Sequence, residues 1–344
     1  MNLKTFLRTG ALLILIGLVA ACGQAGEEGT TASSEENAAG DVKTIKVANY
    51  FASDHPQNVA LRETFKPMVE ENSEGRLKVE IYDNSQLGGE EAFLEGVRNG
   101  TIEMVIAGMF LQNSEPKIGV VEWPFIIRDY DHAKKVLNGP IGEEIAQAFE
   151  QFGVKPLNWT ANGFRVVSSN RAIESLEDFN GFRLRMPNIP NFISVGEALG
   201  ASVIPLAISE VFTALEQGVI DGQENPYATL VHSRFYEVQS HVIETRHIFS
   251  PNIYLVNQAF WDGLGEDLQQ VVAEAADAAA EEQWQLLIAQ ESEMKQYLQE
   301  QGLEIIEPDD AFRQEMVDAM QPVYEELFEK YEWAEDLYNR ITQQ

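Results

Sequence analysis

The apolar residues near the start of the folded chain change their spacing repeatedly, and this alternation is the strongest constraint on the fold. Ile45 and Val47 lead up to Asn49 at every second position, and apolar residues recur in the same way over 77–81, which is typical of half-buried strands. They recur at helical spacing over 61–69, and a second helix is expected over 90–98 before an apolar strand over 102–107. This order of strands and helices predicts a mostly parallel sheet whose crossover connections are helices.

A second strand–helix unit with different spacing follows, so the pattern predicts an α/β protein with two lobes. Strands are expected over 165–169 and 183–186, and apolar residues at helical spacing follow over 192–199. The length of 344 residues also suggests two domains. A proline-free helical pattern runs from about residue 266 to residue 301. At about 50 Å it would bridge two domains unless it is kinked.

The first residues have the pattern of a bacterial export signal. Lys4 and Arg8 precede an apolar run over 11–21, which is too short to span a bilayer comfortably. The run ends directly before Cys22, the only cysteine of the chain. This resembles a lipobox, at which residues 1–21 are removed and the cysteine is lipidated. A plain secretory signal with an incidental cysteine is the alternative.

The segment after Cys22 separates the signal from the folded body. Residues 23–41 contain no large apolar side chain and several acids, so 22–42 is predicted to be a flexible acidic linker. We expect the folded body to lie outside the cytoplasm, in the periplasm or at the outer face of the cytoplasmic membrane. The lipid on Cys22 would be its only attachment to the membrane.

The charge balance and the absence of familiar motifs narrow the function. The chain has 55 acidic and 24 basic side chains and a net charge of −31, which argues against nucleic acid as a partner. A single cysteine excludes an intrachain disulfide and a cysteine-based zinc cluster, and the five histidines lack metal-ligand spacing. No nucleotide-binding, metalloprotease or nucleophile-elbow motif is present. We therefore expect a binding protein, not an enzyme, without metal or cofactor.

Basic residues are scarce, so arginines inside strand-like segments are conspicuous. Arg165 lies among apolar residues at the start of one predicted strand, and Arg183 and Arg185 alternate with apolar residues in another. The latter two share one face of their strand. A guanidinium at the end of a strand can bind a carboxylate through two parallel hydrogen bonds. From the pattern alone, an ion pair with one of the abundant acids is the alternative for each arginine.

Two sequence blocks resemble the signature of a known protein family. They are segments 168–188 (SSNRAIESLEDFNGFRLRMPN) and 200–226 (GASVIPLAISEVFTALEQGVIDGQENP), and segments 85–90 (SQLGGE) and 123–125 (WPF) fit the same family. From about residue 45 to its end, the chain is similar to the DctP family, the solute-binding proteins of TRAP (tripartite ATP-independent periplasmic) transporters. The resemblance implies a two-lobed fold like that of periplasmic binding proteins, with a hinge and a long helix spanning both lobes.

The resemblance also implies a function and its principal residues. Members of the family capture organic acids outside the membrane and deliver them to a TRAP membrane carrier that an ion gradient drives. By motif position, Arg185 is the carboxylate clamp and Arg165 a second cationic contact. Asn225 would form a hydrogen bond with the carboxylate or an adjacent hydroxyl. The clamp motif usually ends in Val-Pro, whereas Met186 precedes the proline here, which conserves the side-chain volume.

The first lobe is expected to set selectivity for the rest of the ligand. Asn49 ends the first predicted strand, His55 lies in the following loop, and Met109 follows the third predicted strand, where open sheets bind ligands. Phe212 is expected at the floor of the pocket. Loop stabilisation is the alternative for His55, and core packing for Phe212. Few basic residues lie near these strand ends, which favours a sugar acid (a uronate or aldonate) over a C4-dicarboxylate.

The predicted division of the chain follows from these assignments. The first lobe would contain residues 43–162 plus about 251–290, and the second, with the clamp, residues 163–250 plus about 291–344. We expect a monomer. Two other classes are alternatives: a binding lipoprotein of an ATP-driven importer, which should lack the two signature blocks, and a lipid-anchored enzyme, which should show a nucleophile–base or metal set.

Overall fold

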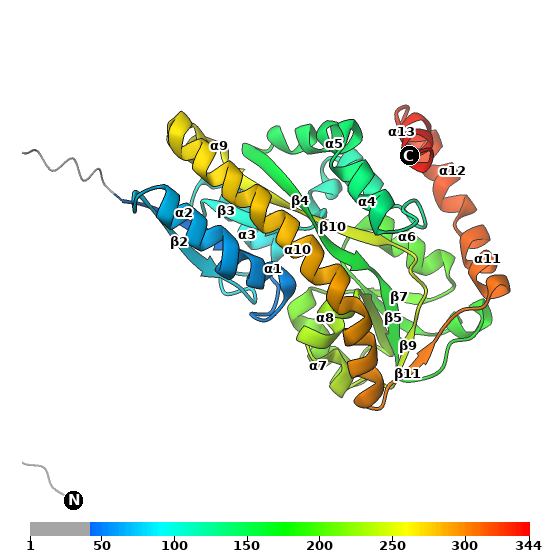
Figure 1. Cartoon of the computed structure of the whole chain (residues 1–344). Coiled ribbons are helices and arrows are strands. Elements are labelled where there is room, and N and C mark those ends of the chain that lie inside the picture. Colours follow the sequence, from blue (N-terminus) through cyan, green and yellow to red (C-terminus); the bar gives the residue numbers. More distant parts are fainter. Residues whose placement is uncertain (1–41) are drawn as a thin grey trace, which may run out of the picture. The chain divides into compact units, whose positions relative to one another are not determined.

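The computed structural model describes residues 42–344 (Figure 1). The predicted signal peptide, Cys22 and all but the last residue of the predicted linker lie outside the described residues. Two separate sheets organise the described chain, which confirms the expected α/β class with two lobes. Every helix within residues 42–344 is too short or too polar to cross a membrane.

The first sheet has five strands in the order β2-β1-β3-β10-β4. Strand β1 runs parallel to β2 and β3, as the alternation of strands and helices predicts, whereas β10 runs antiparallel to β3 and β4. The connections between the strands of this sheet include the helices α1, α2 and α3 and the π-helical turn η1. The bounds are β1 (Lys43–Ala48), α1 (Pro56–Ala60), η1 (Leu61–Phe65), α2 (Lys66–Asn72), β2 (Leu77–Tyr82), α3 (Glu90–Asn99), β3 (Met104–Ala107), β4 (Val154–Phe164) and β10 (Phe249–Asn257).

The second sheet has six strands in the order β11-β9-β5-β8-β6-β7. Strand β6 runs parallel to β7 and β8, and β5 runs antiparallel to β8 and β9. The clamp motif lies in β6, an interior strand between β8 and the edge strand β7. The bounds are β5 (Val166–Ser169), β6 (Arg183–Met186), α6 (Pro190–Ala198), β7 (Ser202–Pro205), α7 (Ile208–Glu216), β8 (Gly222–Asn225), α8 (Tyr227–His232), β9 (His241–Ile243) and β11 (Glu304–Ile306).

The chain passes between the sheets along extended strands and along one long helix. Strand β4 ends at Phe164 and β5 begins at Val166, so a single residue separates the two sheets at this point. Helix α10 (Glu266–Glu300) is continuous over 35 residues and contacts β4 and α1 as well as α8. Figure 1 shows it running diagonally across both lobes. The predicted bridging helix is confirmed.

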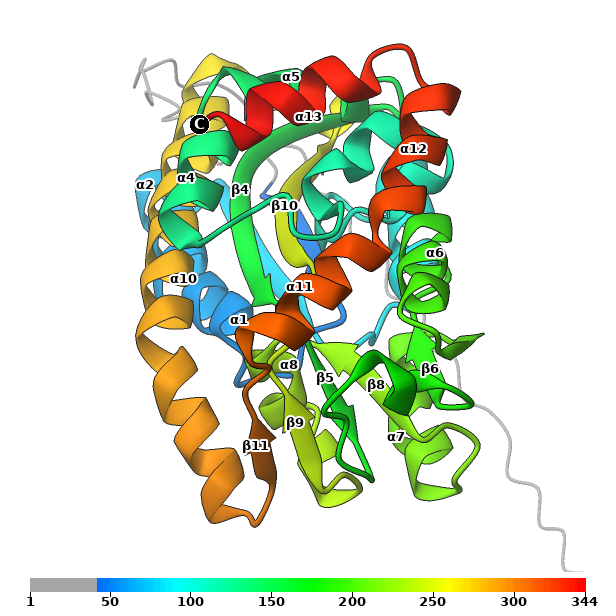
Figure 2. The same cartoon turned by 90° about the vertical axis from the view of Figure 1, so that its right-hand side faces the viewer.

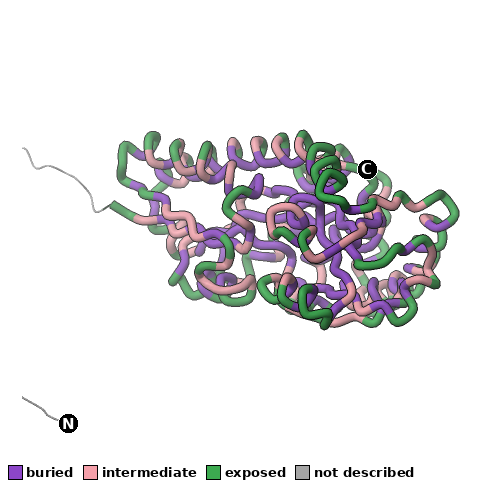
Figure 3. The backbone as a smooth tube through the Cα atoms, turned by 90° about the horizontal axis from the view of Figure 1, so that it is seen from below, coloured by how far each residue is buried: buried purple, intermediate pink, exposed green. Residues whose placement is uncertain are grey.

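Small residues let α10 lie close to the first sheet. Ala275, Ala276 and Ala279 are fully buried on its inner side. Further along the same side, the buried Gln283 amide accepts a hydrogen bond from the backbone N–H of Ala161 (3.0 Å) and donates one to its carbonyl (2.6 Å). Figure 3 shows the buried backbone gathered in the sheets and along the inner side of the helices. The helix is thus fixed to β4 directly before the crossing between lobes.

The C-terminal helices run from the second sheet back to residues 128–150. Figure 2 shows α11 and α12 leading to α13 beside α5. In this segment, α12 contacts α6, and the backbone carbonyl of Ile341 lies 2.9 Å from Nε2 of His132 in α4. The end of the chain therefore packs on residues 128–150, and the division of residues 291–344 between lobes stays a prediction. The remaining bounds are η2 (Phe110–Asn113), η3 (Pro116–Glu122), α4 (Tyr130–Leu137), α5 (Pro140–Glu150), η4 (Leu176–Phe179), η5 (Phe235–Glu237), α9 (Gln258–Asp262), α11 (Asp310–Ala319), α12 (Gln321–Lys330) and α13 (Ala334–Thr342).

Candidate ligand-binding site

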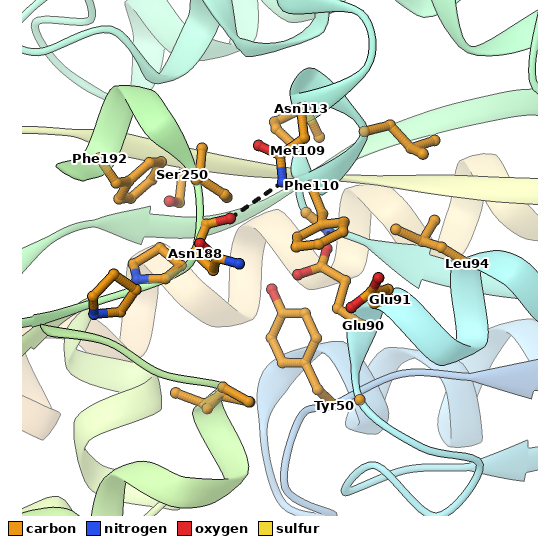
Figure 4. Close-up of a pocket in the computed structure, with 18 of the residues that line it drawn as sticks. Tyr50, Glu90, Glu91, Leu94, Met109, Phe110, Asn113, Asn188, Phe192 and Ser250 are labelled. Atoms are coloured by element: carbon orange, nitrogen blue, oxygen red, sulfur yellow. Dashed lines mark hydrogen bonds between the residues drawn. The ribbon is translucent and has the colours of Figure 1, made fainter. Parts of the chain in front are cut away.

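A cavity of about 1010 Å³ lies between the lobes and is lined by residues that follow the ends of strands in both sheets. Tyr50 follows β1, and Met109 follows β3. Asn188 follows β6, and Asn225 ends β8. Ligands of open α/β sheets bind at the carboxyl ends of strands, so this is the expected place for a site. Figure 4 shows Tyr50, Glu90 and Phe110 on one side and Asn188, Phe192 and Ser250 on the other.

Arg165 is held rigidly at the crossing between β4 and β5. Its Nη2 donates to Oε1 of Glu224 (2.8 Å) and to Oδ1 of Asn225 (3.1 Å), and its Nε donates to the other oxygen of Glu224. Its Nη1 donates to Oγ of Ser250 at 3.1 Å, and the ring of Phe192 lies 5.1 Å from the guanidinium carbon. Both interpretations of Arg165 from the sequence therefore apply: it has an ion-pair partner, and it also lines the cavity.

The Arg165–Glu224 pair stays ionised despite its burial. Burial works against the charge of each group, but the carboxylate of Glu224 raises the pKa of Arg165. In return, Arg165 outweighs the burial of Glu224 and lowers the pKa of that carboxyl to about 2. His247 also contacts Glu224, with its Nε2 3.3 Å from Oε2. This part of the wall is therefore neutral overall and already satisfied without a ligand.

Arg185 is buried beside the cavity without a counter-ion. Its side chain is only 3% exposed, and its Nε and Nη2 donate to the carbonyl oxygen of Leu206 at 3.0 and 2.6 Å. Among the described residues, no carboxylate lies within ion-pair distance of its guanidinium, whereas the half-exposed Arg183 pairs with Asp221. Burial lowers the pKa of Arg185 to about 10, with Arg165 acting in the same direction and Glu224 against it. A buried cation of this kind requires an anion to offset its desolvation.

The opposite wall carries two acids to which the sequence analysis gave no role, although Glu90 ends the family segment 85–90. Oε1 of Glu90, at the start of α3, accepts a hydrogen bond from the backbone N–H of Gly108 at 2.7 Å. Glu122, at the end of η3, accepts hydrogen bonds from Gln112 (2.9 Å) and Ser250 (3.0 Å). Exclusion of water raises the pKa of Glu90 to about 7 and that of Glu122 to about 8. Both are weak acids at neutral pH, able to donate a proton to an acceptor.

The family follows from comparison with known proteins. The sequence profile of the bacterial extracellular solute-binding proteins of family 7, DctP, matches residues 47–331.

This chain is a DctP-family solute-binding protein.

A TRAP periplasmic solute-binding protein from Haemophilus influenzae, whose crystal structure holds L-gulonate, is similar over 88% of this chain and 99% of that one, with 42% identity and a TM-score of 0.86. A TRAP protein from Roseobacter denitrificans with bound L-galactonate is similar over 84% of this chain and 99% of that one, with 35% identity and a TM-score of 0.78. The 2,3-diketo-L-gulonate-binding periplasmic protein YiaO of Escherichia coli is 32% identical over 80% of this chain and 83% of its own length. The resemblance and the two-lobed fold expected from it are confirmed.

Four of the predicted contacts of this DctP-family protein meet at the cavity, namely Arg165, Arg185, Asn225 and Met109. Asn225 donates to Oε1 of Gln223 (2.7 Å), which orients its amide beside Arg165. Met109 is almost fully buried. These residues end strands or follow them closely, so the order of strands was enough to bring them together.

Asn49, His55 and Phe212 are not among the residues that line the cavity, which corrects our expectation. The Asn49 amide donates to Oδ1 of Asn58 at 2.8 Å, so local hydrogen bonds hold it inside the first lobe. Nδ1 of His55 accepts from the backbone N–H of Gln57 and caps α1. Phe212 packs against the apolar core. For His55 and Phe212, the structural alternatives describe the observed contacts.

Direct contacts between the lobes close over the cavity of this protein. The side-chain amide of Asn113 donates to the carbonyl of Asn188 at 3.2 Å, which Figure 4 marks with a dashed line. The amide of Asn191 donates to the carbonyl of Glu122, also at 3.2 Å. Each bond joins a residue of η2 or η3 to one that follows β6, so each depends on how close the lobes are.

Proposed function

We propose that this protein captures a six-carbon sugar acid, an aldonate such as L-gulonate or a uronate, outside the cytoplasm and delivers it to a TRAP membrane carrier. The observation that carries the proposal is Arg185, a buried cation that lines the cavity and has no counter-ion among the described residues. The related proteins with bound L-gulonate and L-galactonate support the class of ligand. A C4-dicarboxylate is the alternative ligand.

Binding begins with the carboxylate of the ligand. The free edge of the Arg185 guanidinium donates to the carboxylate, and Arg165, which its partners already hold in position, supplies a second contact. The amide of Asn225 binds the carboxylate or the hydroxyl next to it. Because Arg185 is charged before the ligand arrives, the carboxylate removes an unfavourable buried charge, and this gain is specific to an anion.

Closure of the lobes follows from contacts that need both walls. The ligand hydroxyls meet Tyr50, Glu90 and Met109 on the first lobe while the carboxylate stays on the second. The ligand shifts the equilibrium between open and closed forms only as far as it binds the closed form better. The bond from Asn113 to Asn188 is available to the closed form and adds to that difference.

Anchoring by Cys22 is a separate part of the proposal. The lipobox-like sequence places the only cysteine directly after the predicted signal peptide. Diacylation with an amide-linked chain holds a protein stably at a membrane, and the acidic linker lets the body move above its surface. Mass spectrometry of the mature N-terminus tests this: an unmodified Cys22, or cleavage elsewhere, would contradict it. We propose a monomer, which light scattering tests directly.

The decisive experiment for the function is calorimetry with L-gulonate. Protein expressed without residues 1–22 retains every described residue. Arg185→Ala should weaken binding by at least about 100-fold, because charge-assisted hydrogen bonds contribute about 1.5–3 kcal/mol each. Arg183→Ala is the matched control, since Arg183 lies in the same strand but pairs with Asp221 away from the cavity. Equal affinities of wild type and Arg185→Ala would refute the clamp, and binding of neutral sugars alone would refute the proposed function.

A further inference from the structure

The first-lobe wall of the cavity carries two carboxyl groups that have no cationic partner. Neither Glu90 nor Glu122 forms an ion pair with any described residue, although 17 pairs between an acid and a lysine or arginine occur among those residues. Glu122 is 3% exposed, and Glu90 is half-buried at the edge of the cavity. In a chain whose acids mostly lie on the surface, two unpaired carboxyls facing one ligand site require a separate explanation.

The geometry holds these groups together at the ends of β1 and β3. A Cβ atom placed on Gly108 would lie 3.1 Å from Oε1 of Glu90 and 3.4 Å from Oη of Tyr50, so both groups converge on this glycine. Glu122 approaches from η3, and Ser250 stands between it and Arg165: Ser250 Oγ donates to Glu122 at 3.0 Å and accepts from Arg165 at 3.1 Å. The serine thus separates the acid from the arginine.

The charges of the closed cavity balance for one anionic group only. Arg165 and Glu224 neutralise each other, and Arg185 is neutralised by one ligand carboxylate. Arg98, the remaining cation among the described residues that line the cavity, is exposed and pairs with Glu95. Glu91 and Glu210, which also line the cavity, add further negative charge. No positive group is left for a second carboxylate.

We propose that Glu90 and Glu122 make the cavity selective for monoanionic polyhydroxy acids: Glu90 binds ligand hydroxyls, and both carboxyls reject a second ligand carboxylate. This inference rests on the proposed function and narrows it, because it decides between an aldonate and a dicarboxylate. The raised pKa of each carboxyl supports it, since a protonated acid donates to a hydroxyl without adding charge. Tyr50 adds a neutral hydroxyl beside them.

A shared proton would not rescue the binding of a dicarboxylate. If Glu122 gave its proton to the second ligand carboxylate, or shared it in a hydrogen bond, one uncompensated negative charge would still remain in the closed cavity. Like charges at close range in a partly desolvated site repel strongly, which is a known way of building selectivity. The wall therefore distinguishes a terminal CH₂OH from a terminal carboxylate.

The test compares two ligands that differ at that end alone. D-glucarate is L-gulonate with its terminal CH₂OH oxidised to a carboxylate. Calorimetry at pH 8 with the wild-type protein should give an affinity for L-gulonate at least about 100-fold higher than for D-glucarate. In the double variant Glu90→Gln, Glu122→Gln, this ratio should fall below about tenfold, chiefly because D-glucarate binds better. Glu71→Gln, which removes an exposed charge on α2 outside the cavity, is the control and should leave the ratio near its wild-type value.

The possible outcomes separate this inference from the function beneath it. Equal affinities of the two acids in the wild type, or an unchanged ratio in the double variant, would overturn the selectivity role while leaving the sugar-acid function intact. Failure of both acids and of other sugar acids to bind would overturn the function and the inference together. If circular dichroism shows that the double variant does not fold, the wild-type protein alone provides the test. Its ratio of L-gulonate affinity to D-glucarate affinity should rise from pH 6 to pH 9, and a constant ratio contradicts the proposal.

Discussion

The second-lobe wall and the first-lobe wall of the cavity both contain buried or half-buried carboxyl groups, but in different electrostatic states. On the second lobe, Arg165 and Glu224 are fully paired, and the pairing keeps both ionised despite their burial. On the first lobe, Glu90 and Glu122 have no cation among the described residues, and exclusion of water favours their neutral forms. The difference teaches that burial alone does not decide protonation: the nearest counter-charge does.

The two walls are therefore suited to recognise different groups of the ligand. A permanently charged, hydrogen-bonded guanidinium suits a ligand group that is always an anion, and its partners keep it in place before the ligand arrives. Neutral acids suit hydroxyls, because they can both donate and accept. The second lobe is therefore built to anchor and the first to discriminate, and the following predictions test that division.

The largest effect is expected from breaking the pair on the second lobe. Glu224→Gln leaves the buried Arg165 without its counter-charge, and removing one partner of a buried pair costs about 3–5 kcal/mol of stability. Urea unfolding at pH 7 measures this. Glu237→Gln, which removes the partner of the exposed Arg234, is the control and should change stability much less. A similar loss in both variants would mean that the buried pair has no special role.

The pH dependence of that loss follows from the lowered pKa of Glu224. Its folded-state pKa of about 2 lies below the ordinary value of 4.5, so the contribution of the pair is present at neutral pH. It is lost as pH falls from about 4.5 through about 2. The stabilities of wild type and Glu224→Gln should therefore converge in acid.

A smaller effect, of the opposite sign in pH, is expected from the first lobe. Glu90 and Glu122 have raised pKa values of about 7 and about 8, so both are neutral at pH 6 and ionise as pH rises through this window. Each ionisation places a negative charge beside an anionic ligand. The affinity for L-gulonate should fall by about tenfold between pH 6 and pH 9.

The same two carboxyls provide the control for this dependence. The affinity of the variant Glu90→Gln, Glu122→Gln should be nearly flat over that range, because its amides do not titrate. Their contribution to the stability of the free protein has the same sign: it is full below the ordinary pKa of 4.5 and is lost as pH rises through about 7 to 8. A wild-type affinity that does not change with pH would contradict the assigned protonation states.

The two walls also differ in how much of each could be predicted from the sequence. The spacing of apolar residues predicted the parallel strands of the first sheet and the bridging α10, because period reflects which side of an element is buried. Arg165, Arg185 and Asn225 were found because cations are rare in this chain and because the surrounding motif resembles a known family. Strand order then placed them at one edge of the second sheet.

The features of the site that the sequence did not predict depend on which hydrogen-bond or ion-pair partner each polar group has in the folded protein. Glu224 is one of 55 acids, so nothing in the sequence marked it as the partner of Arg165. Glu122 was equally unmarked, and Glu90 lies in a family segment whose resemblance assigned it no role. Asn49 and His55 stand at the right strand end, but local hydrogen bonds to Asn58 and Gln57 hold them within the first lobe. Local capping by a side chain leaves no periodic pattern in the sequence. A capping residue therefore cannot be told apart there from a ligand-binding residue.

The smallest effect should come from the contact that joins the two walls. Asn113 lies at the surface of the first lobe, and its amide reaches the carbonyl of Asn188 only across the cavity. Asn113→Ala removes this bond from the closed form and leaves the open form unchanged. Because one such bond contributes about 0.5–1.5 kcal/mol, the dissociation rate of L-gulonate should rise about two- to tenfold with little change in the association rate. Stopped-flow fluorescence measures both rates. Asn170→Ala is the matched control, since its exposed amide donates to the carbonyl of Val238 within the second lobe at 3.0 Å and does not depend on closure. If Asn113→Ala slowed association instead, the contact would belong to the open form. Anchoring by the second lobe and discrimination by the first would then not depend on closure of the lobes.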